Sequence, residues 1–371
     1  MNFLDRITER DAALYSDLEK KACGYKIVIY GAEKMGKRLY DILTSKGFKI
    51  DFAVVDDEYI TNTHEIKDIP VLPLSSIVHA HEKYNYIVGF QGFSNTHHSV
   101  LKKTANEIFF YDIVRFIVDE TRLNTPYCYY ERHSDDINRV YEYLEDDVSR
   151  DVLVGYINQR ISGKFEYSEK YYSKDHYYCD FIPFLENEIL MDCGARDGNT
   201  VASFLDHIKN RNIKFTGEIY AIEPDKVNFG ALTENIKYIP CHFYNIGVWN
   251  KNTRLEFKSC HDGRSMFSCA IKSDLLKYKT IDNVDVKKID TILNGNKITF
   301  LKMDIEGSEF EALLGAEKTI KKYKPKLAIS LYHKEDDLFK IPELIYSFCN
   351  TYKMYLRWHS YSYNELVLYA L

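Results

Sequence analysis

The chain has 371 residues, of which 45% are apolar and 28% charged. That length exceeds what one ordinary hydrophobic core accommodates, so two globular domains are expected. The formal net charge of −6 argues against a protein that binds nucleic acid phosphates, because such proteins gather positive charge.

The first residues of the chain and its cysteines indicate the cellular compartment in which the protein is expected. Residues 1–21 lack the basic start and apolar run of a signal peptide, and their spacing of apolar residues is that of an amphipathic helix. No stretch approaches the roughly 18 apolar residues needed to cross a bilayer. The eight Cys include no pair at the two-residue spacing of zinc or redox motifs. These features predict a soluble, cytoplasmic protein with reduced thiols.

The first third of the chain alternates short apolar runs with helical patterns, which predicts a parallel sheet with right-handed crossovers. The expected strands lie at 25–31, 49–57, 84–90 and 107–113, and residues 69–77 suggest a short strand followed by a capped helix. We therefore expect a small Rossmann-like α/β domain over residues 1–125. A helical connector over 126–180 follows, because acidic and apolar residues alternate at helical spacing through 134–163.

The segment YGAEKMG at 30–36 is similar to the glycine-rich turn of dinucleotide-binding folds, with Asp56 and Asp57 about 20 residues further on. Glu33 replaces the middle glycine and adds bulk and negative charge where a pyrophosphate would approach. An active dehydrogenase is therefore not expected. The alternatives are a degenerate domain that recognises a sugar nucleotide or glycan, and a purely structural one.

The second half of the chain restarts the alternation, and we expect an α/β domain over residues 181–371. Its expected strands lie at 188–194, 218–224, 242–249, 297–307 and 324–333, followed by two closing antiparallel strands. A single helix is expected over 308–323. Together these elements predict a mostly parallel, Rossmann-like sheet.

Two turns of this second half carry polar residues suited to a ligand. In MDCGARDGNT, Asp192 ends an apolar strand, and Gly194 and Gly198 follow. Ligands of open α/β sheets bind beyond the carboxyl ends of the strands, and glycine allows close backbone approach. Glu223 ends the next strand, where a carboxylate can accept both hydroxyls of a ribose. An ordinary strand–helix turn and a solvated acid are the alternatives. Cys193 is expected to point into the core.

A set of segments in the second half resembles a known family. They are MDCGARDGNT, IYAIEPDKVNFGALTENI, NIGVWN, IDTIL and FLKMDIEGSEFEALLGAEKTIKKYKPKLAISLYH. In this order and spacing they resemble the FkbM-type methyltransferases over residues 165–371, and the connector resembles that of two-domain members. The resemblance implies a class I methyltransferase fold with a seven-stranded sheet, S-adenosylmethionine as methyl donor, and methylation of a hydroxyl on a sugar or polyketide.

The resemblance also assigns donor-binding positions in this chain. The loop around the methionine part of the donor would comprise Asp192, Gly194, Asp197, Gly198, Asn199 and Thr200. Glu223, followed by Pro224, corresponds to the acceptor of the ribose hydroxyls. Asn245 stands where such folds contact adenine, with an amide in place of the commoner carboxylate.

Methyl transfer to a hydroxyl needs aligned atoms and a group that takes the hydroxyl proton. Asp304, Glu306 and His333 lie at the expected ends of the fourth and fifth strands. We expect Asp304 to be a functional acid and His333 to be the base or an acceptor anchor, since histidine titrates near neutrality. Glu306 could equally stabilise the start of the next helix. Asp304, Glu306 and Glu309 would suit Mg²⁺, but the sequence shows no further ligands, so no metal is predicted.

Two further features allow two interpretations each. Arg264 and Ser265 could grip a substrate or form an exposed hairpin tip, and Tyr171 and Tyr172 could cover the donor or simply pack. The 31 Tyr suit a hydroxylated ligand as well as a core.

The expected activity is O-methylation of a saccharide or glycoconjugate precursor, with no nucleic-acid partner and with homo-oligomerisation left open. A glycan-binding protein with an inactive methyltransferase fold and a methyltransferase for non-sugar small molecules are the alternatives.

Overall fold

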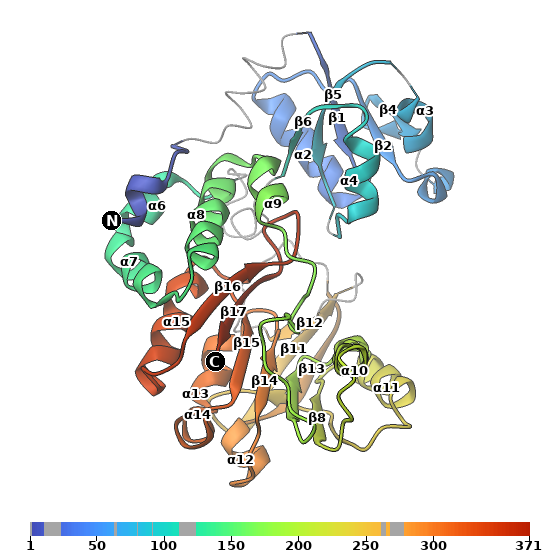
Figure 1. Cartoon of the computed structure of the whole chain (residues 1–371). Coiled ribbons are helices and arrows are strands. Elements are labelled where there is room, and N and C mark those ends of the chain that lie inside the picture. Colours follow the sequence, from blue (N-terminus) through green and yellow to red (C-terminus); the bar gives the residue numbers. More distant parts are fainter. Residues whose placement is uncertain are drawn as a thin grey trace. The chain divides into compact units, whose positions relative to one another are not determined.

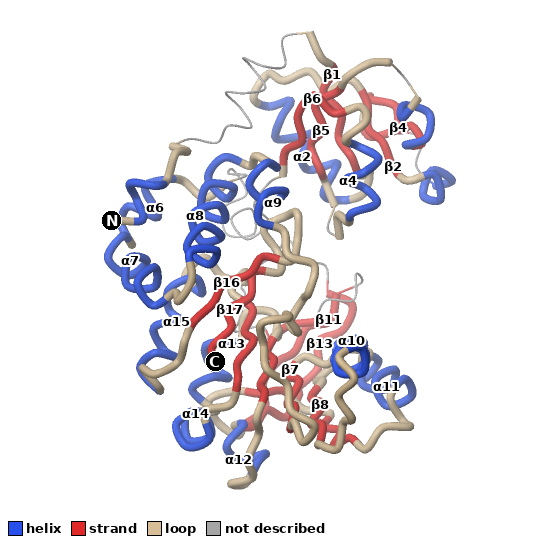
Figure 2. Tube along the Cα trace, viewed as in Figure 1, coloured by secondary structure: helices blue, strands red, loops and turns tan. Residues whose placement is uncertain are grey.

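The computed structural model describes residues 2–10, 24–62, 65–79, 81–90, 92–110, 124–260, 265–267 and 278–371. The chain forms two compact units, labelled by element in Figure 1 and by secondary structure in Figure 2. The first unit comprises residues 1–135, 151–172 and 360–364, and the second comprises 136–150, 173–359 and 365–371. The amphipathic helix expected over 1–21 falls mostly outside the described residues, which show only the 3-10 turn η1 (Phe3–Arg6) there.

The first unit contains a six-stranded sheet in the order β3-β4-β2-β1-β5-β6. The strands are β1 (Lys26–Tyr30), β2 (Phe52–Val55), β3 (Glu65–Ile66), β4 (Ile69–Pro73), β5 (Tyr84–Val88) and β6 (Ala105–Phe109). All neighbours are parallel except β3 and β4. The remaining elements are η2 (Asp57–Asn62), α2 (Lys34–Ser45), α3 (Leu74–Val78), α4 (Asn95–Leu101), α6 (Tyr127–Arg132) and α9 (Phe165–Tyr171).

The second unit is built on a seven-stranded sheet in the order β16-β17-β15-β14-β7-β8-β9. The strands are β7 (Ile189–Cys193), β8 (Glu218–Ile222), β9 (Cys241–Tyr244), β14 (Phe300–Met303), β15 (Lys326–Ser330), β16 (Met354–Trp358) and β17 (Leu366–Ala370). The helices are α10 (Asn199–Asn210), α11 (Lys226–Asn235), α12 (Ile289–Leu293), α13 (Glu309–Leu314), α14 (Glu317–Tyr323) and α15 (Asp337–Phe348). β17 runs antiparallel to β15 and β16, and all other neighbouring strands of this sheet are parallel. The expected Rossmann-like sheet of seven strands is confirmed.

A second, four-stranded sheet in this unit was not expected. It has the order β10-β13-β11-β12, with β10 (Gly247–Val248), β11 (Thr253–Cys260), β12 (Ser265–Phe267) and β13 (Tyr278–Lys287). The single strand expected over 242–249 is therefore wrong, because the chain leaves the large sheet after Tyr244 and enters the small one at Gly247. A small apolar cluster of Trp249, Phe257, Val284 and Val286 holds this sheet together.

Two expected helices are interrupted. The segment 134–163 forms α7 (Ser134–Tyr143) and α8 (Asp147–Ser162), and the Asp146 carboxylate between them accepts a hydrogen bond from Ser149 N at 2.7 Å. The helix expected over 308–323 breaks into α13 and α14. At the break, the Gly315 carbonyl accepts a hydrogen bond from Asp290 N at 3.0 Å, and Thr319 N donates to the Asp290 carboxylate at 2.8 Å, in place of a helical bond between Gly315 and Thr319. None of the helices described is both long and apolar enough to cross a membrane.

Candidate active site

The predicted site residues of the second unit gather where its parallel strands end. β7 is hydrogen-bonded to β8 on one side and to β14 on the other, and β14 pairs with β15. Asp192 lies in β7, while Glu223, Asp304 and His333 follow β8, β14 and β15. Because the carboxyl ends of parallel strands meet at one edge, residues far apart in sequence form one site there.

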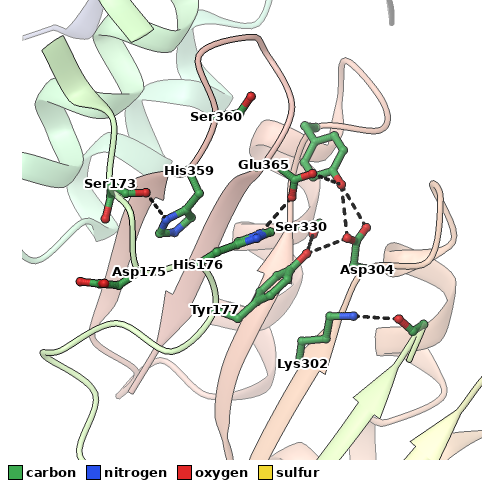
Figure 3. Close-up of polar contacts among 12 residues, drawn as sticks. Ser173, Asp175, His176, Tyr177, Lys302, Asp304, Ser330, His359, Ser360 and Glu365 are labelled. Atoms are coloured by element: carbon green, nitrogen blue, oxygen red, sulfur yellow. Dashed lines mark hydrogen bonds and ion pairs between the residues drawn. The ribbon is translucent and has the colours of Figure 1, made fainter. Parts of the chain in front are cut away.

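The side chain of Asp192 is fully buried, and both of its carboxylate oxygens contact neighbouring side chains. One of its carboxylate oxygens lies 2.9 Å from Lys302 Nζ, and the other accepts a hydrogen bond from Thr200 Oγ1. Lys302 also donates to the Gly194 carbonyl at 2.9 Å (Figure 3). Burial opposes the charge on Lys302, but Asp192 and Asp304 raise its pKa above the ordinary value. The buried pair thus fastens β7, β14 and the start of α10 to the glycine turn, and Asp192 positions that turn.

The glycine turn lies directly against the end of β14. Gly194 has φ +83°, and a Cβ there would overlap the carbonyl oxygen of Asp304. Gly198, with φ +92°, is the N-cap of α10. Arg196 between them also has a positive φ of +49°, an uncommon conformation for a side-chain-bearing residue. The turn therefore needs glycine for a steric reason.

The polar residues at the start of α10 are more exposed. Asp197 accepts hydrogen bonds from Asn199 N at 3.3 Å and from Asn199 Nδ2 at 2.9 Å, and its carbonyl accepts one from Asn235. These contacts order the first turn of α10. Its free N–H groups follow the glycine turn, as at other ligand-binding helix starts.

In the described part of the structure, the Glu223 side chain accepts hydrogen bonds from backbone N–H groups and from no side chain. Its side chain accepts Arg196 N and Asp225 N, each at 2.9 Å, one on each oxygen. Burial raises the pKa of this carboxyl to about 7. Asn245 donates its amide to the carbonyls of Glu223 and Pro224, at 2.9 and 3.1 Å, and so supports the turn that carries Glu223.

An acid–histidine cluster lies on the β14–β15 side of the site. Asp304 accepts a hydrogen bond from Tyr177 at 2.6 Å (Figure 3) and another from Tyr332 at 3.2 Å. His333 Nε2 lies 3.4 Å from Asp304 and 3.6 Å from Glu306. Glu306 adopts φ +55°, so the turn after β14 is strained at the cluster. The three residues predicted for catalysis are therefore neighbours.

Two buried acids complete the cluster. Glu309 is fully buried, with one oxygen 3.0 Å from His333 Nδ1 and hydrogen-bonded to Ile305 N. Burial opposes protonation of His333, but the carboxylates around it, Glu309 foremost, raise its pKa to about 10. Burial, reinforced by Glu309, raises the pKa of Asp337 to about 8.

Sequence reasoning missed Tyr177, Lys302 and Tyr332 as parts of this site. Lys302 had a signal, since it is the one charged residue within the apolar run ITFLKM. Tyr177 had none, because it lies in an irregular segment among many tyrosines. Tyr171 and Tyr172, considered as a donor cover, belong to the first unit, where Tyr172 stacks on Tyr361 with ring centroids 4.4 Å apart. Arg264 lies outside the described residues, and Ser265 begins β12.

Comparisons with known proteins agree with this geometry. Residues 192–362 match the family model of the FkbM methyltransferase domain. The structure of an FkbM methyltransferase from Methylobacillus flagellatus aligns with 22% identity and a TM-score of 0.67, over 99% of this chain and 95% of that one. Fibrillarin from Aeropyrum pernix gives 9% identity and a TM-score of 0.32, over 52% and 70% of the two chains, too weak to support an argument. A search of curated proteins found no match.

The seven-stranded sheet with its glycine turn and strand-end acids defines a class I methyltransferase fold. More specifically, residues 192–362 match the FkbM methyltransferase domain, so this region of the chain is a methyltransferase domain of that type. The family expected from the sequence motifs is thereby confirmed.

Proposed function

We propose that the protein transfers the methyl group of S-adenosylmethionine to a hydroxyl of a saccharide or glycoconjugate precursor. The observation that carries this proposal is the contact between the two halves of the site. Gly194 of the glycine turn packs on the backbone of Asp304, which belongs to the acid–histidine cluster. A donor at the turn and an acceptor at the cluster would therefore be neighbours, as a direct displacement requires.

The residues of the turn fit the donor. Each oxygen of Glu223 accepts one backbone N–H, which orients the carboxylate and leaves further lone pairs for the two ribose hydroxyls. A side chain at Gly194 would fill the close approach between the turn and β14. When bound, the donor supplies a methyl group on a positively charged sulfur. We assign the ribose to Glu223 and the methionine part to the turn from Gly194 to Thr200.

The cluster supplies the acceptor side. Burial opposes ionisation of Asp304, but His333 and Lys302 hold its pKa below the usual range, so it is a carboxylate at neutral pH. His333, with its pKa near 10, already carries a proton there and suits an anchor for the acceptor oxygen. The hydroxyl proton therefore passes to a carboxylate, Asp304 or Glu306, as the methyl group is transferred.

The saccharide is proposed from the FkbM membership and from the hydroxyls beside the cluster. Tyr332 is partly exposed and places its ring and hydroxyl next to Asp304, a combination that suits a hydroxylated ligand, while the buried Tyr177 supports Asp304 from within the protein. Such precursors of surface polysaccharides are made in the cytoplasm, where we place the enzyme. We propose no nucleic-acid partner.

The experiment is methyl transfer from labelled donor to a panel of sugar nucleotides and oligosaccharides, with products located by mass spectrometry and NMR. We expect an O-methyl group on a saccharide, abolished by Asp304→Asn while binding of S-adenosylhomocysteine persists. Methyl groups found only on nitrogen or carbon would rule out the reaction. Transfer only to hydroxyls of non-sugar compounds would overturn the saccharide assignment and keep the chemistry.

A further inference from the structure

The geometry of the cluster points to a divalent metal cation bound by Asp304, Glu309 and His333. These residues come from three elements: Asp304 follows β14, Glu309 begins α13, and His333 follows β15. One ligand atom from each lies within 4.8 Å of the other two. Around an ion with bonds of about 2.1 Å, ligand atoms lie up to roughly 4.2 Å apart, so only small side-chain rotations would close the set.

Two atoms of this set lack the hydrogen bonds that buried polar atoms normally make. Within the described part of the chain, neither His333 Nδ1 nor Glu309 Oε2 has a hydrogen-bond partner, although both are buried. The 3.0 Å approach of Nδ1 to the other Glu309 oxygen is an ion-pair contact with poor hydrogen-bond geometry. Leaving such atoms unpaired costs free energy, because each gives up its hydrogen bonds to water without replacing them. A cation between the two side chains would satisfy both, and on binding it would displace the proton that His333 carries in the metal-free protein.

The charge around the cluster also favours a cation. Glu306 faces His333 from the strained turn, and Asp337 lies beside Glu309. Asp304, Glu306 and Glu309 thus place three carboxylates around one imidazole, and Asp337, whose pKa is about 8, adds a fourth above that pH. The nearest lysines have other partners as well: Lys302 pairs with Asp192 and acts on Asp304 from there, and Lys334 acts on Asp337. Negative charge buried without compensation is costly, and a divalent ion is the compact way to supply it.

The three proposed ligands differ in exposure, and this difference would leave one side of the cation open to solvent. Glu309 and His333 are buried to 0% and 6% side-chain exposure, whereas Asp304 retains 22% and Glu306 33%. The ion would thus be held from within and accessible where Asp304 meets the glycine turn. There it would bind the acceptor hydroxyl and lower its pKa. The oxygen–methyl bond then forms as the sulfur–methyl bond breaks, and the proton leaves to Glu306.

That role rests on the proposed methyl transfer, whereas binding of the ion does not. The sequence had predicted no metal because its acids lacked further ligands. The fold supplies the missing one, His333, from a strand end 24 positions beyond Glu309 (333 − 309). A mixed oxygen and nitrogen set suits Mn²⁺ or Zn²⁺ better than Mg²⁺.

The test measures Mn²⁺ binding to the full chain after treatment with EDTA, by loss of the EPR signal of free Mn²⁺. We expect one tight site per chain, with affinity at least about tenfold weaker in both Glu309→Gln and Asp304→Asn. The matched control is Glu317→Gln, an exposed acid of α14 whose loss should change nothing. Competition with Zn²⁺ and Mg²⁺ ranks the ions.

Affinity for S-adenosylhomocysteine, measured separately by calorimetry, distinguishes this inference from the proposed function. Absence of a Mn²⁺ or Zn²⁺ site in wild-type protein that still binds the nucleoside would overturn the cation and leave methyl transfer standing. Unchanged Mn²⁺ binding in Asp304→Asn would do the same, even if Glu309→Gln fails to fold. A bound ion without any nucleoside affinity would instead sink the proposed function.

Discussion

The two units place similar residues at the same positions of their sheets and use them differently. In each, a glycine follows the first strand and an acid follows the second: Gly31 and Asp56 in the first unit, Gly194 and Glu223 in the second. Asp56 is occupied by side chains, since it accepts Tyr30 Oη and lies 3.3 Å from His97 Nε2. Glu223 accepts only backbone N–H groups in the contacts seen here.

This difference separates an acid that serves packing from one prepared for a ligand. Backbone donors orient a carboxylate without covering its remaining lone pairs, whereas a tyrosine hydroxyl and an imidazole fill the space that a ligand would use. Glu33 adds to the contrast, because it is exposed at the start of α2 where a phosphate would need a close backbone approach. The first unit therefore shares the arrangement of the second, but its strand-end acid contacts side chains of its own unit.

The largest effect is expected at the buried Lys302–Asp192 pair. Lys302→Met would leave Asp192 buried without a counter-charge, which typically costs about 3–5 kcal/mol. Both tryptophans of the chain, Trp249 and Trp358, lie in the second unit, so their fluorescence in urea reports on that unit. The comparison is Lys26→Met in the first unit, whose partner Glu82 is exposed, and we expect no change in its unfolding followed by circular dichroism, which reports on both units. Equal tolerance of both substitutions would contradict the assigned role of the pair.

The second effect concerns the glycine turns. Gly194→Ala combines a positive φ with a clash against Asp304, so we expect a loss of about 2–4 kcal/mol and no measurable nucleoside binding. At Gly31 the φ is also positive, but a Cβ would lie 3.2 Å from its nearest neighbours. Gly31→Ala should therefore destabilise less and leave binding of S-adenosylhomocysteine intact. Calorimetric titration of both variants measures the difference.

The third effect tests the two strand-end acids directly. Glu223→Gln keeps the shape but removes the charge that would accept the ribose hydroxyls, and hydrogen bonds to a charged group contribute about 1.5–3 kcal/mol. We expect affinity for S-adenosylhomocysteine to fall roughly 10- to 100-fold. Asp56→Asn should leave it unchanged. A loss of affinity in Asp56→Asn would show that the first unit takes part in donor binding after all.

Features that depend on a short stretch of sequence could be predicted, whereas features that depend on contacts between distant residues could not. The glycine turn, Glu223 and the MDIEG turn are contiguous motifs at strand ends, and the parallel order of the sheet brings them together. Tyr177 and Lys302 acquire their roles only through contacts made over more than 100 positions, with Asp304 and Asp192. No local pattern encodes such contacts. The acid–histidine cluster was predicted by position, but the burial of Glu309 was not.

Two predictions about the fold were wrong for the same physical reason. The small sheet pairs Gly247 of β10 with Val286 of β13, about 40 positions further on, and no pattern within either short segment encodes that pairing. The break between α13 and α14 comes from Asp290, which takes the hydrogen bonds that Gly315 and Thr319 would otherwise make to each other. In both cases tertiary contacts override a local pattern that was itself correctly recognised.

The smallest effect is a dependence on pH that only the second unit should show. Because the pKa of Glu223 rises from 4.5 to about 7 on folding, the folded state holds its proton more tightly than the unfolded state. The resulting stability is present below pH 4.5 and is lost as pH rises through 7, by an amount on the order of 1–3 kcal/mol. Nucleoside affinity should run the opposite way, rising through pH 7 as the carboxylate forms. Tryptophan fluorescence in urea from pH 5 to 8 measures the first trend and calorimetry the second. Glu223→Gln should flatten both, and a slope that survives this substitution would assign the titration to another group.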